Sequence, residues 1–225
     1  MRELDAGAIA DDLDADGYAV VRGWFDAAAC ERVRAQYDDD PVYRKTVTME
    51  RHGFGRGEYR YFGYPLPPDV GAAREMLYAA LVPTANAWME RLGRATRFPA
   101  SLPLMLALSA EAGQARAAAL VLRYRDGDYN ALHQDIYGEV AFPLQGTVLL
   151  SQPGREFTGG EFVLVENRAR QQSVAHVVPL ERGDLVIFPN RERVRRDGPK
   201  STVRHGVARV RSGERVTLGL ILHDA

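Results

Sequence analysis

The second half of this chain is rich in strand-forming segments, and this feature constrains the fold more than any other. From about residue 118 onward, short runs of β-branched and aliphatic residues alternate with Gly, Pro, Asp and Asn, which mark turns. No helical segment separates these runs, so the βαβ connections of a parallel sheet are not expected. The pattern predicts an antiparallel sandwich or barrel. The predicted strands are residues 118–124, 140–150, 161–165, 173–178, 184–188, 203–210 and 215–222.

The first half has a different character: residues 1–115 are predicted to be mainly helical support for a strand-rich core at residues 116–225. Asp26 precedes a helix-forming run and is a predicted N-cap. The interior Pro83 should kink the longest helix or divide it, because proline lacks a backbone donor. The glycine-rich segment 53–57 has neither the strand nor the helix of a nucleotide-binding loop, so a flexible loop is predicted. The predicted helices lie around Ile9 and Leu13, over 28–37 and over 70–92, with an apolar run at 18–21 that can form a short strand.

The amino-acid composition limits the kinds of protein that this chain can be. The chain has 225 residues, of which 46% are hydrophobic and 26% charged, as expected for one globular domain with a substantial core. A net charge of −1 does not require a polyanionic partner. Cys30 is the single cysteine, which fits a reducing compartment. Because the N-terminal segment lacks the apolar core of a signal peptide and the apolar stretch 102–108 is too short to span a bilayer, we expect a cytoplasmic protein with no membrane partner.

His133 and Asp135 form a candidate pair of metal ligands. They lie two residues apart in an extended segment, where alternate side chains point to the same side. A third ligand must come from a distant strand, and His205 is the best candidate, since the later strands of a jelly roll return beside the early ones. Two imidazoles and one carboxylate leave coordination positions open, as non-haem Fe(II) oxygenases require. The other histidines, His52, His176 and His223, stay open as alternatives.

Arg215 lies ten residues beyond His205, at the start of the last predicted strand. Arg215, Thr217 and Gly219 share one face of this strand, which is small and polar with a single cation. A guanidinium pairs with a carboxylate through two parallel hydrogen bonds, so this face suits a pocket for a short dicarboxylate. A lone His-x-Asp motif is common on protein surfaces without a metal. The four positions together favour a site for a metal and a dicarboxylate.

The HxD motif, the distal histidine and the arginine ten residues later resemble the double-stranded β-helix oxygenases that use Fe(II) and 2-oxoglutarate. Longer stretches, above all YNALHQDIYGE, resemble a bacterial oxygenase family proposed to act oxidatively on damaged DNA, and the likeness covers nearly the whole chain. The resemblance implies a jelly-roll, cupin-like core packed against helices. It also implies hydroxylation of a C–H bond by O2, with formation of succinate and CO2. The implied roles are iron ligation by His133, Asp135 and His205, and 2-oxoglutarate binding by Arg215, Tyr124 and Thr217.

The substrate is less constrained than the cofactors. The strand after His205 lacks the arginine-asparagine-arginine pattern of nucleic-acid dealkylating oxygenases, and the spacing of Arg215 is the habit of prolyl-hydroxylase-like members. This difference and the near-neutral charge favour a small organic molecule. Nucleic acid stays open because residues 191–215 hold nine Arg or Lys against three acids, and such a run can contact phosphates. A catalytically silent jelly-roll binding protein is a third possibility, which the intact ligand set and Arg215 disfavour. The cations expected to grip a phosphate backbone are Arg191, Arg193, Arg195, Arg196 and Lys200.

Polar and aromatic residues near the predicted ligands are candidates for substrate contact. An aromatic cluster in the first half can stack a base, can roof a small-molecule pocket, or can anchor a loop on the core. That cluster consists of Tyr59, Tyr61, Phe62 and Tyr64. The predicted substrate-facing residues are Asp128, Tyr129, Asn130, Gln134, Tyr137 and Tyr61.

Overall fold

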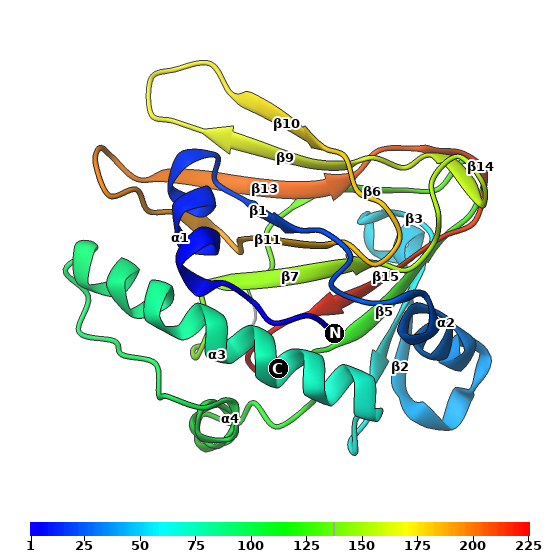
Figure 1. The fold of residues 1–225 in the computed structure, drawn as a ribbon, viewed down its shortest axis with the longest axis horizontal. Helices are drawn as coiled ribbons and strands as arrows, with labels where there is room; N and C mark the ends of the chain where they lie inside the picture. The colour runs from blue at the N-terminus through cyan, green and yellow to red at the C-terminus, as the bar shows by residue number, and fades with distance from the viewer. Residues whose placement is uncertain (137) are drawn as a thin grey trace.

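The computed structural model describes residues 1–136 and 138–225, and its strands in these ranges form two large antiparallel sheets (Figure 1). The major sheet consists, in order, of β1 (Ala19–Val21), β11 (Leu185–Pro189), β7 (Leu144–Leu149), β15 (Arg215–Leu220), β5 (Leu120–Tyr124), β4 (Glu58–Phe62) and β2 (Tyr43–Thr48). The minor sheet consists of β10 (Val174–Val178), β9 (Phe162–Asn167), β13 (Ser201–Val207), β6 (Tyr129–His133) and β3 (Gly55–Arg56), with β12 (Glu192–Arg193) paired to β13. A separate ribbon pairs β14 (Val210–Gly213) with β8 (Phe157–Gly159).

This architecture confirms the predicted jelly-roll core packed against helices. Each of the seven strands predicted in the second half is present, with boundaries shifted by a few residues. The alternation predicted for the last strand also holds. Val216, Leu218 and Leu220 of β15 pack into the helix-covered core, whereas Arg215 and Thr217 face the opposite side, between the sheets.

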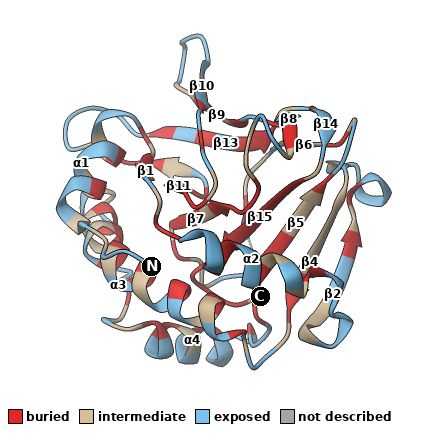
Figure 2. Cartoon of the chain, turned by 45° about the vertical axis from the view of Figure 1, so that its right-hand side comes forward, coloured by how far each residue is buried: buried red, intermediate tan, exposed pale blue. Residues whose placement is uncertain are grey.

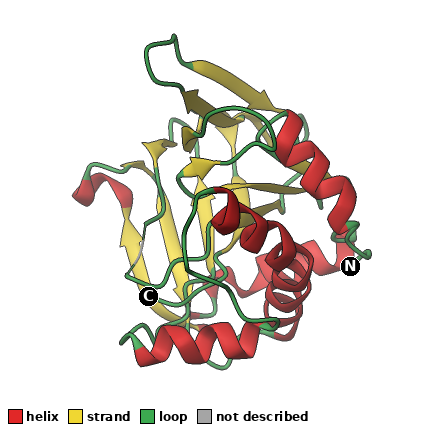
Figure 3. Ribbon diagram, turned by 90° about the vertical axis from the view of Figure 1, so that its left-hand side faces the viewer, coloured by secondary structure: helices red, strands yellow, loops and turns green. Residues whose placement is uncertain are grey.

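The helices gather on one side of the strands (Figure 3). Asp26 caps the second helix as predicted, because its side chain accepts a hydrogen bond from the backbone nitrogen of Ala29 at 2.7 Å. The longest helix packs closely on β7 at Gly146, where an added Cβ would lie 2.8 Å from the Leu77 side chain. The helices are α1 (Ala6–Ala15), α2 (Ala27–Ala35), α3 (Pro68–Arg91) and α4 (Leu102–Glu111), with short 3-10 turns η1 (Gln36–Asp38), η2 (Asp40–Val42) and η3 (Met49–His52).

Pro83 does not divide the longest helix, so of the two expected outcomes, a kink or a division, the division is excluded. α3 runs without a break through this residue. Pro83 and Ala79, whose carbonyl loses its helical partner, are both exposed. Water can therefore satisfy that carbonyl, and the helix tolerates the proline on its solvent face.

The first half is less helical than predicted. β4 pairs with β5, and β2 pairs with β4, so both extend the major sheet. The segment predicted as a flexible loop contains β3, which pairs with β6 through Gly55 and Arg56. The pattern was missed because β4 alternates charged with aromatic residues, and both kinds of side chain find partners once the strand is in place.

Three apolar clusters fill the interior. The largest lies between the helices and the outer face of the major sheet and includes Trp24, Leu77 and Phe142. The two others lie around the inner faces of the sheets. Figure 2 shows buried residues along β7 and β15 and exposed residues at the outer end of β9 and β10. Within the described residues, no helix is long and apolar enough to cross a membrane.

Candidate metal centre

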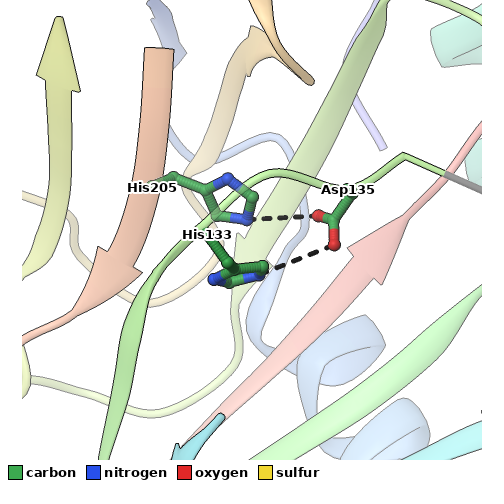
Figure 4. A group of neighbouring side chains, drawn as sticks. All are labelled: His133, Asp135 and His205. Carbon is green, nitrogen blue, oxygen red and sulfur yellow. Dashed lines mark ion pairs between the residues drawn. The ribbon is translucent and has the colours of Figure 1, made fainter. Parts of the chain in front are cut away.

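The minor sheet brings the three predicted ligands together, because His205 on β13 is the register partner of His133 on β6. Asp135 follows soon after β6, and its carboxylate faces both rings from one side (Figure 4). Its carboxylate oxygens are 3.5 Å from Nε2 of His133 and 3.2 Å from Nε2 of His205. The candidate ligand atoms of the three residues all lie within 4.8 Å of one another. This spacing suits a single bound ion.

The protonation states of the clustered side chains also suit a bound cation. Nδ1 of His133 lies 2.8 Å from the carbonyl oxygen of Ala131, so we assign the proton to Nδ1 and the lone pair to Nε2. Burial, followed by the nearby His205, lowers the pKa of His133, which keeps this ring neutral. Burial alone would raise the pKa of Asp135, but the two imidazoles and a hydrogen bond from Gln145 hold it well below its usual range. The cluster therefore places a buried anion beside nitrogen lone pairs, and a divalent cation would balance that charge.

A β-bulge decides which residues of β6 face the cluster. His205 pairs with His133 and Val207 pairs with Asn130, so β6 holds one residue more than β13 over this stretch. In a regular strand, Asn130 and His133 would point to opposite faces. The extra residue changes the direction in which the side chains of β6 point, so Asn130 and His133 both line one cavity.

Gln145 holds the carboxylate from the major sheet, on β7. Its Nε2 donates a hydrogen bond to Oδ2 of Asp135 at 2.9 Å, and the side chain is only 4% exposed. The sequence analysis missed this residue. Nothing local marks it, because it lies on a different strand and only the packing of the sheets brings it to Asp135.

Arg215 lies in the same cavity as the metal cluster. It is 1% exposed, and among the described residues its Nε and Nη1 have no hydrogen-bond partner and it forms no ion pair. Burial lowers the pKa of the guanidinium to about 10, so it stays charged at neutral pH. Gly160 leaves room for it, since a Cβ there would lie 2.9 Å from Cδ of Arg215. A buried cation with unused donors calls for an anionic ligand.

Tyr124 and Thr217 accompany Arg215 in the cavity wall. Tyr124 is its register partner on β5, and the guanidinium carbon lies 5.6 Å from the centre of the tyrosine ring. Asn130 donates a hydrogen bond to the Tyr124 hydroxyl at 3.2 Å. Because burial raises the pKa of Tyr124 to about 12, the hydroxyl keeps its proton and can donate it to a ligand.

The cavity has a volume of about 220 Å³. Its lining includes the predicted residues Asn130, Gln134 and Tyr61. Asp128 and Tyr129 do not line it. Asp128 instead accepts a hydrogen bond from the backbone of Arg125 and pairs with Arg56 at 3.1 Å, which fixes the turn before β6. Tyr137 lies outside the described residues. Aromatic lining residues that the sequence analysis did not assign to the site are Phe54 and Phe162.

The alternative histidines lie apart from the cluster. His223 is buried and its Nδ1 accepts a hydrogen bond from the backbone nitrogen of Phe142 at 3.2 Å. His176 on β10 faces Glu166 at 4.0 Å, and the His52 ring stacks on Phe54. The structure thus groups only His133, Asp135 and His205 among the described residues.

Four cations of the basic run before His205 form ion pairs within the protein, which bears on the open possibility that this run contacts phosphates. Arg193 is buried and donates to Glu166 at 2.7 Å and to the carbonyl oxygens of Asp14 and Ala15 at 2.6 and 2.7 Å, at the end of α1. The neighbouring cations form further ion pairs: Arg195 with Glu166, Arg196 with Asp11, and Lys200 with Glu192. Arg193 is thus committed to the fold, whereas Arg196 and Lys200 are about half exposed in surface ion pairs, at 50% and 54%.

Residues 57–225 match the model of a protein family described as an oxygenase catalysing oxidative methylation of damaged DNA. The uncharacterized protein Rv2227 of Mycobacterium tuberculosis is 46% identical over 189 residues, which cover 81% of each chain. A prolyl-4-hydroxylase from Pseudomonas putida superposes with a TM-score of 0.56 and 17% identity over 96% of both chains. A 2OG-Fe(II) oxygenase family oxidoreductase from Burkholderia pseudomallei superposes with a TM-score of 0.55 and 17% identity, over 100% of this chain and 94% of that one. With these two structures the chain shares the fold.

Proposed function

This chain belongs to the oxygenase family whose model it matches, and from that premise we propose that it uses Fe(II) and 2-oxoglutarate to hydroxylate a C–H bond of a small organic substrate. One observation carries the proposal. A His-Asp-His cluster and a buried guanidinium without an ion pair among the described residues line a single cavity. The first is a donor set for iron, and the second is a receptor for a carboxylate.

His133, Asp135 and His205 would hold the iron, which with 2-oxoglutarate and O2 supplies the oxidation that forms succinate, CO2 and a hydroxylated product. The chain prepares this site before any ligand arrives. The hydrogen bond to Ala131 fixes the His133 ring with Nε2 toward Asp135. Gln145 holds the Asp135 carboxylate in place, so the ligand geometry needs little adjustment.

Arg215 would bind the far carboxylate of 2-oxoglutarate. Its unused N–H groups supply charge-assisted hydrogen bonds, and the surrounding burial strengthens them. The Tyr124 hydroxyl accepts from Asn130 and therefore has its own proton available for the same carboxylate. Thr217, one step along the same face of β15, completes this end of the pocket.

A second candidate function is oxidative dealkylation of damaged nucleic acid, which the description of the family favours. Four cations of the basic run already form ion pairs within the protein, which weighs against contact of the whole run with a phosphate backbone. A catalytically silent binding protein fits poorly, because it would have no need for both a complete ligand set and a buried arginine without an ion pair.

The test is succinate release in the presence of Fe(II), 2-oxoglutarate and O2, measured against panels of free metabolites and alkylated oligonucleotides. We expect a substrate to raise succinate release and to gain one oxygen atom for each succinate formed. Formaldehyde released from a methylated oligonucleotide would select the second candidate. Succinate release no greater than that of the metal-free protein, with every substrate, would overturn both.

A further inference from the structure

Phe54 lies at the mouth of the cavity, and its side chain is exposed. It lines the same cavity as the metal cluster, yet 47% of its surface is open to solvent. Ile136, directly after Asp135, is a second exposed apolar residue of the lining, at 51%. Apolar side chains kept in water at the edge of a cavity mark a surface that a ligand covers.

The position of Phe54 is fixed by its backbone. Its nitrogen donates to the carbonyl oxygen of Met49 at 3.2 Å, and its carbonyl oxygen accepts from the nitrogen of Ala131 at 2.9 Å. Gly55 follows with a φ of +127°, and a Cβ there would lie 2.4 Å from the carbonyl oxygen of Tyr129. Only glycine allows this close approach of β3 to β6, so the fold itself displays the phenylalanine at the mouth.

The surroundings of Phe54 are aromatic and nearly uncharged. The His52 ring stacks on it, with ring centres 5.3 Å apart and planes inclined by 22°. Apart from the metal cluster and Arg215, the described lining residues carry no charged side chain. Asn130, Gln134 and Thr147 supply polar groups that can hydrogen-bond a neutral ligand. The aromatic lining residues are Phe54, Tyr59, Tyr61, Tyr124 and Phe162.

We propose that Phe54 is a substrate-binding residue that stacks on a flat, uncharged heteroaromatic ring, extending the His52–Phe54 stack by one layer. The inference rests on the proposed function, because it places the substrate of that same site. An anionic or purely aliphatic substrate would gain little from this surface, whereas a heteroaromatic ring can stack on Phe54 and hydrogen-bond to the polar lining. Such a ring can belong to a free compound or to a base in a nucleic acid.

The experiment uses the Phe54→Trp protein, loaded with Fe(II) and 2-oxoglutarate without oxygen. Trp24 and Trp88 are buried at 0% and 2% exposure, so the new indole reports on the mouth. The probes are N6-methyladenosine, which is uncharged at neutral pH, and a short single-stranded oligonucleotide that contains one N6-methyladenine. We expect quenching of the new indole by at least one probe. Binding of both probes with equal affinity identifies a free ring as sufficient, and binding of the oligonucleotide alone identifies a nucleic-acid strand.

In calorimetric titrations, the Phe54→Ala protein should bind the same probe at least about tenfold more weakly than wild type, because stacking on an aromatic side chain is lost. Leu132→Ala is the matched control: Leu132 is 45% exposed on neighbouring β6 but does not line the cavity, so probe affinity should not change. Equal probe affinity of wild type and Phe54→Ala overturns the inference. So does a wild-type protein that binds 2-oxoglutarate but neither probe. A wild-type protein that does not bind 2-oxoglutarate removes the proposed function itself.

Discussion

The two sheets contribute different parts of the site and are buried to different degrees. Every residue of β15 and β11 in the major sheet is buried, because helices cover one face and the minor sheet covers the other. In the minor sheet, β13 alternates between buried and exposed residues over its first half, and β10 is mostly open. The candidate metal ligands therefore lie on a sheet with a solvated outer face, whereas Arg215 and Gln145 lie on the sheet enclosed on both sides. A change at the partly exposed His133 should affect binding alone, and changes in the major sheet should affect binding and stability together.

The sharpest test of this division is removal of a metal ligand. His133→Ala, Asp135→Ala and His205→Ala should each abolish Fe(II) binding, since one donor of three is lost. For His133→Ala, whose side chain is partly exposed, the unfolding temperature of the metal-free protein should change little. Calorimetric titration with Fe(II) under nitrogen measures the first effect, and thermal unfolding measures the second. His176→Ala, in the same sheet but outside the cluster, should bind iron like wild type. Tight iron binding by the His205→Ala protein would show that the ligands are wrongly assigned.

Glu166 marks a place in the minor sheet where stability should depend strongly on a charge. Its side chain is 2% exposed and pairs with Arg193 at 2.7 Å. Burial alone would raise the pKa of Glu166, but the surrounding arginines outweigh this and lower it to about 2. Glu166→Gln leaves Arg193 buried without its counter-ion, so the free energy of unfolding at pH 7 should fall by roughly 3–5 kcal/mol.

The pH dependence of the free energy of unfolding tests the Glu166 ion pair in a second way. A carboxylate whose folded pKa is lowered stabilises the protein above its ordinary pKa of 4.5, and this contribution is lost as the pH falls toward 2. The difference between wild type and Glu166→Gln in urea unfolding should therefore shrink over that window. A difference that stays constant from pH 7 to pH 3 would mean that the ion pair is not its source.

Arg215 tests the coupling of binding to stability in the major sheet. Arg215→Met should weaken 2-oxoglutarate binding by about tenfold to a hundredfold, because charge-assisted hydrogen bonds are lost, while iron still binds. The lowered pKa of Arg215 means that its charge destabilises the folded protein at every pH below about 10, and this cost vanishes only above 12.5. The unfolding temperature of the variant without 2-oxoglutarate should thus equal or exceed that of wild type. Arg215→Lys keeps the positive charge but lacks the two parallel N–H donors of a guanidinium, so it should bind 2-oxoglutarate with intermediate affinity.

Gln145 should give the smallest effect, because it acts on the metal through Asp135. Gln145→Leu keeps the volume of the side chain roughly but removes the donor at 2.9 Å, so Fe(II) affinity should fall on the order of tenfold. Gln145→Asn, which has a shorter donor, is the conservative comparison. If Fe(II) affinity is unchanged in the leucine variant while its unfolding temperature falls, Gln145 is a packing residue and does not position the carboxylate.

The ligands and the strands were predictable because their signals are local. His133 and Asp135 are two residues apart, and Arg215 heads a strand whose alternation separates a polar face from an apolar one. The strands of the first half were missed for an opposite reason. β4 and β3 have weak patterns by themselves and form because β5 and β6 offer them open edges.

The sequence by itself determined which side chains can bind a metal and a dicarboxylate, since ligand chemistry belongs to residue types and spacing within one strand. Only the tertiary structure decided how strands distant in the chain meet. It placed Gln145 against Asp135, turned Asn130 into the cavity through a bulge, and set Phe54 at its mouth. It also gave the arginines of the basic run their internal partners. These outcomes depend on contacts between segments far apart in sequence, and the alternation within one strand does not say which distant segment it will meet.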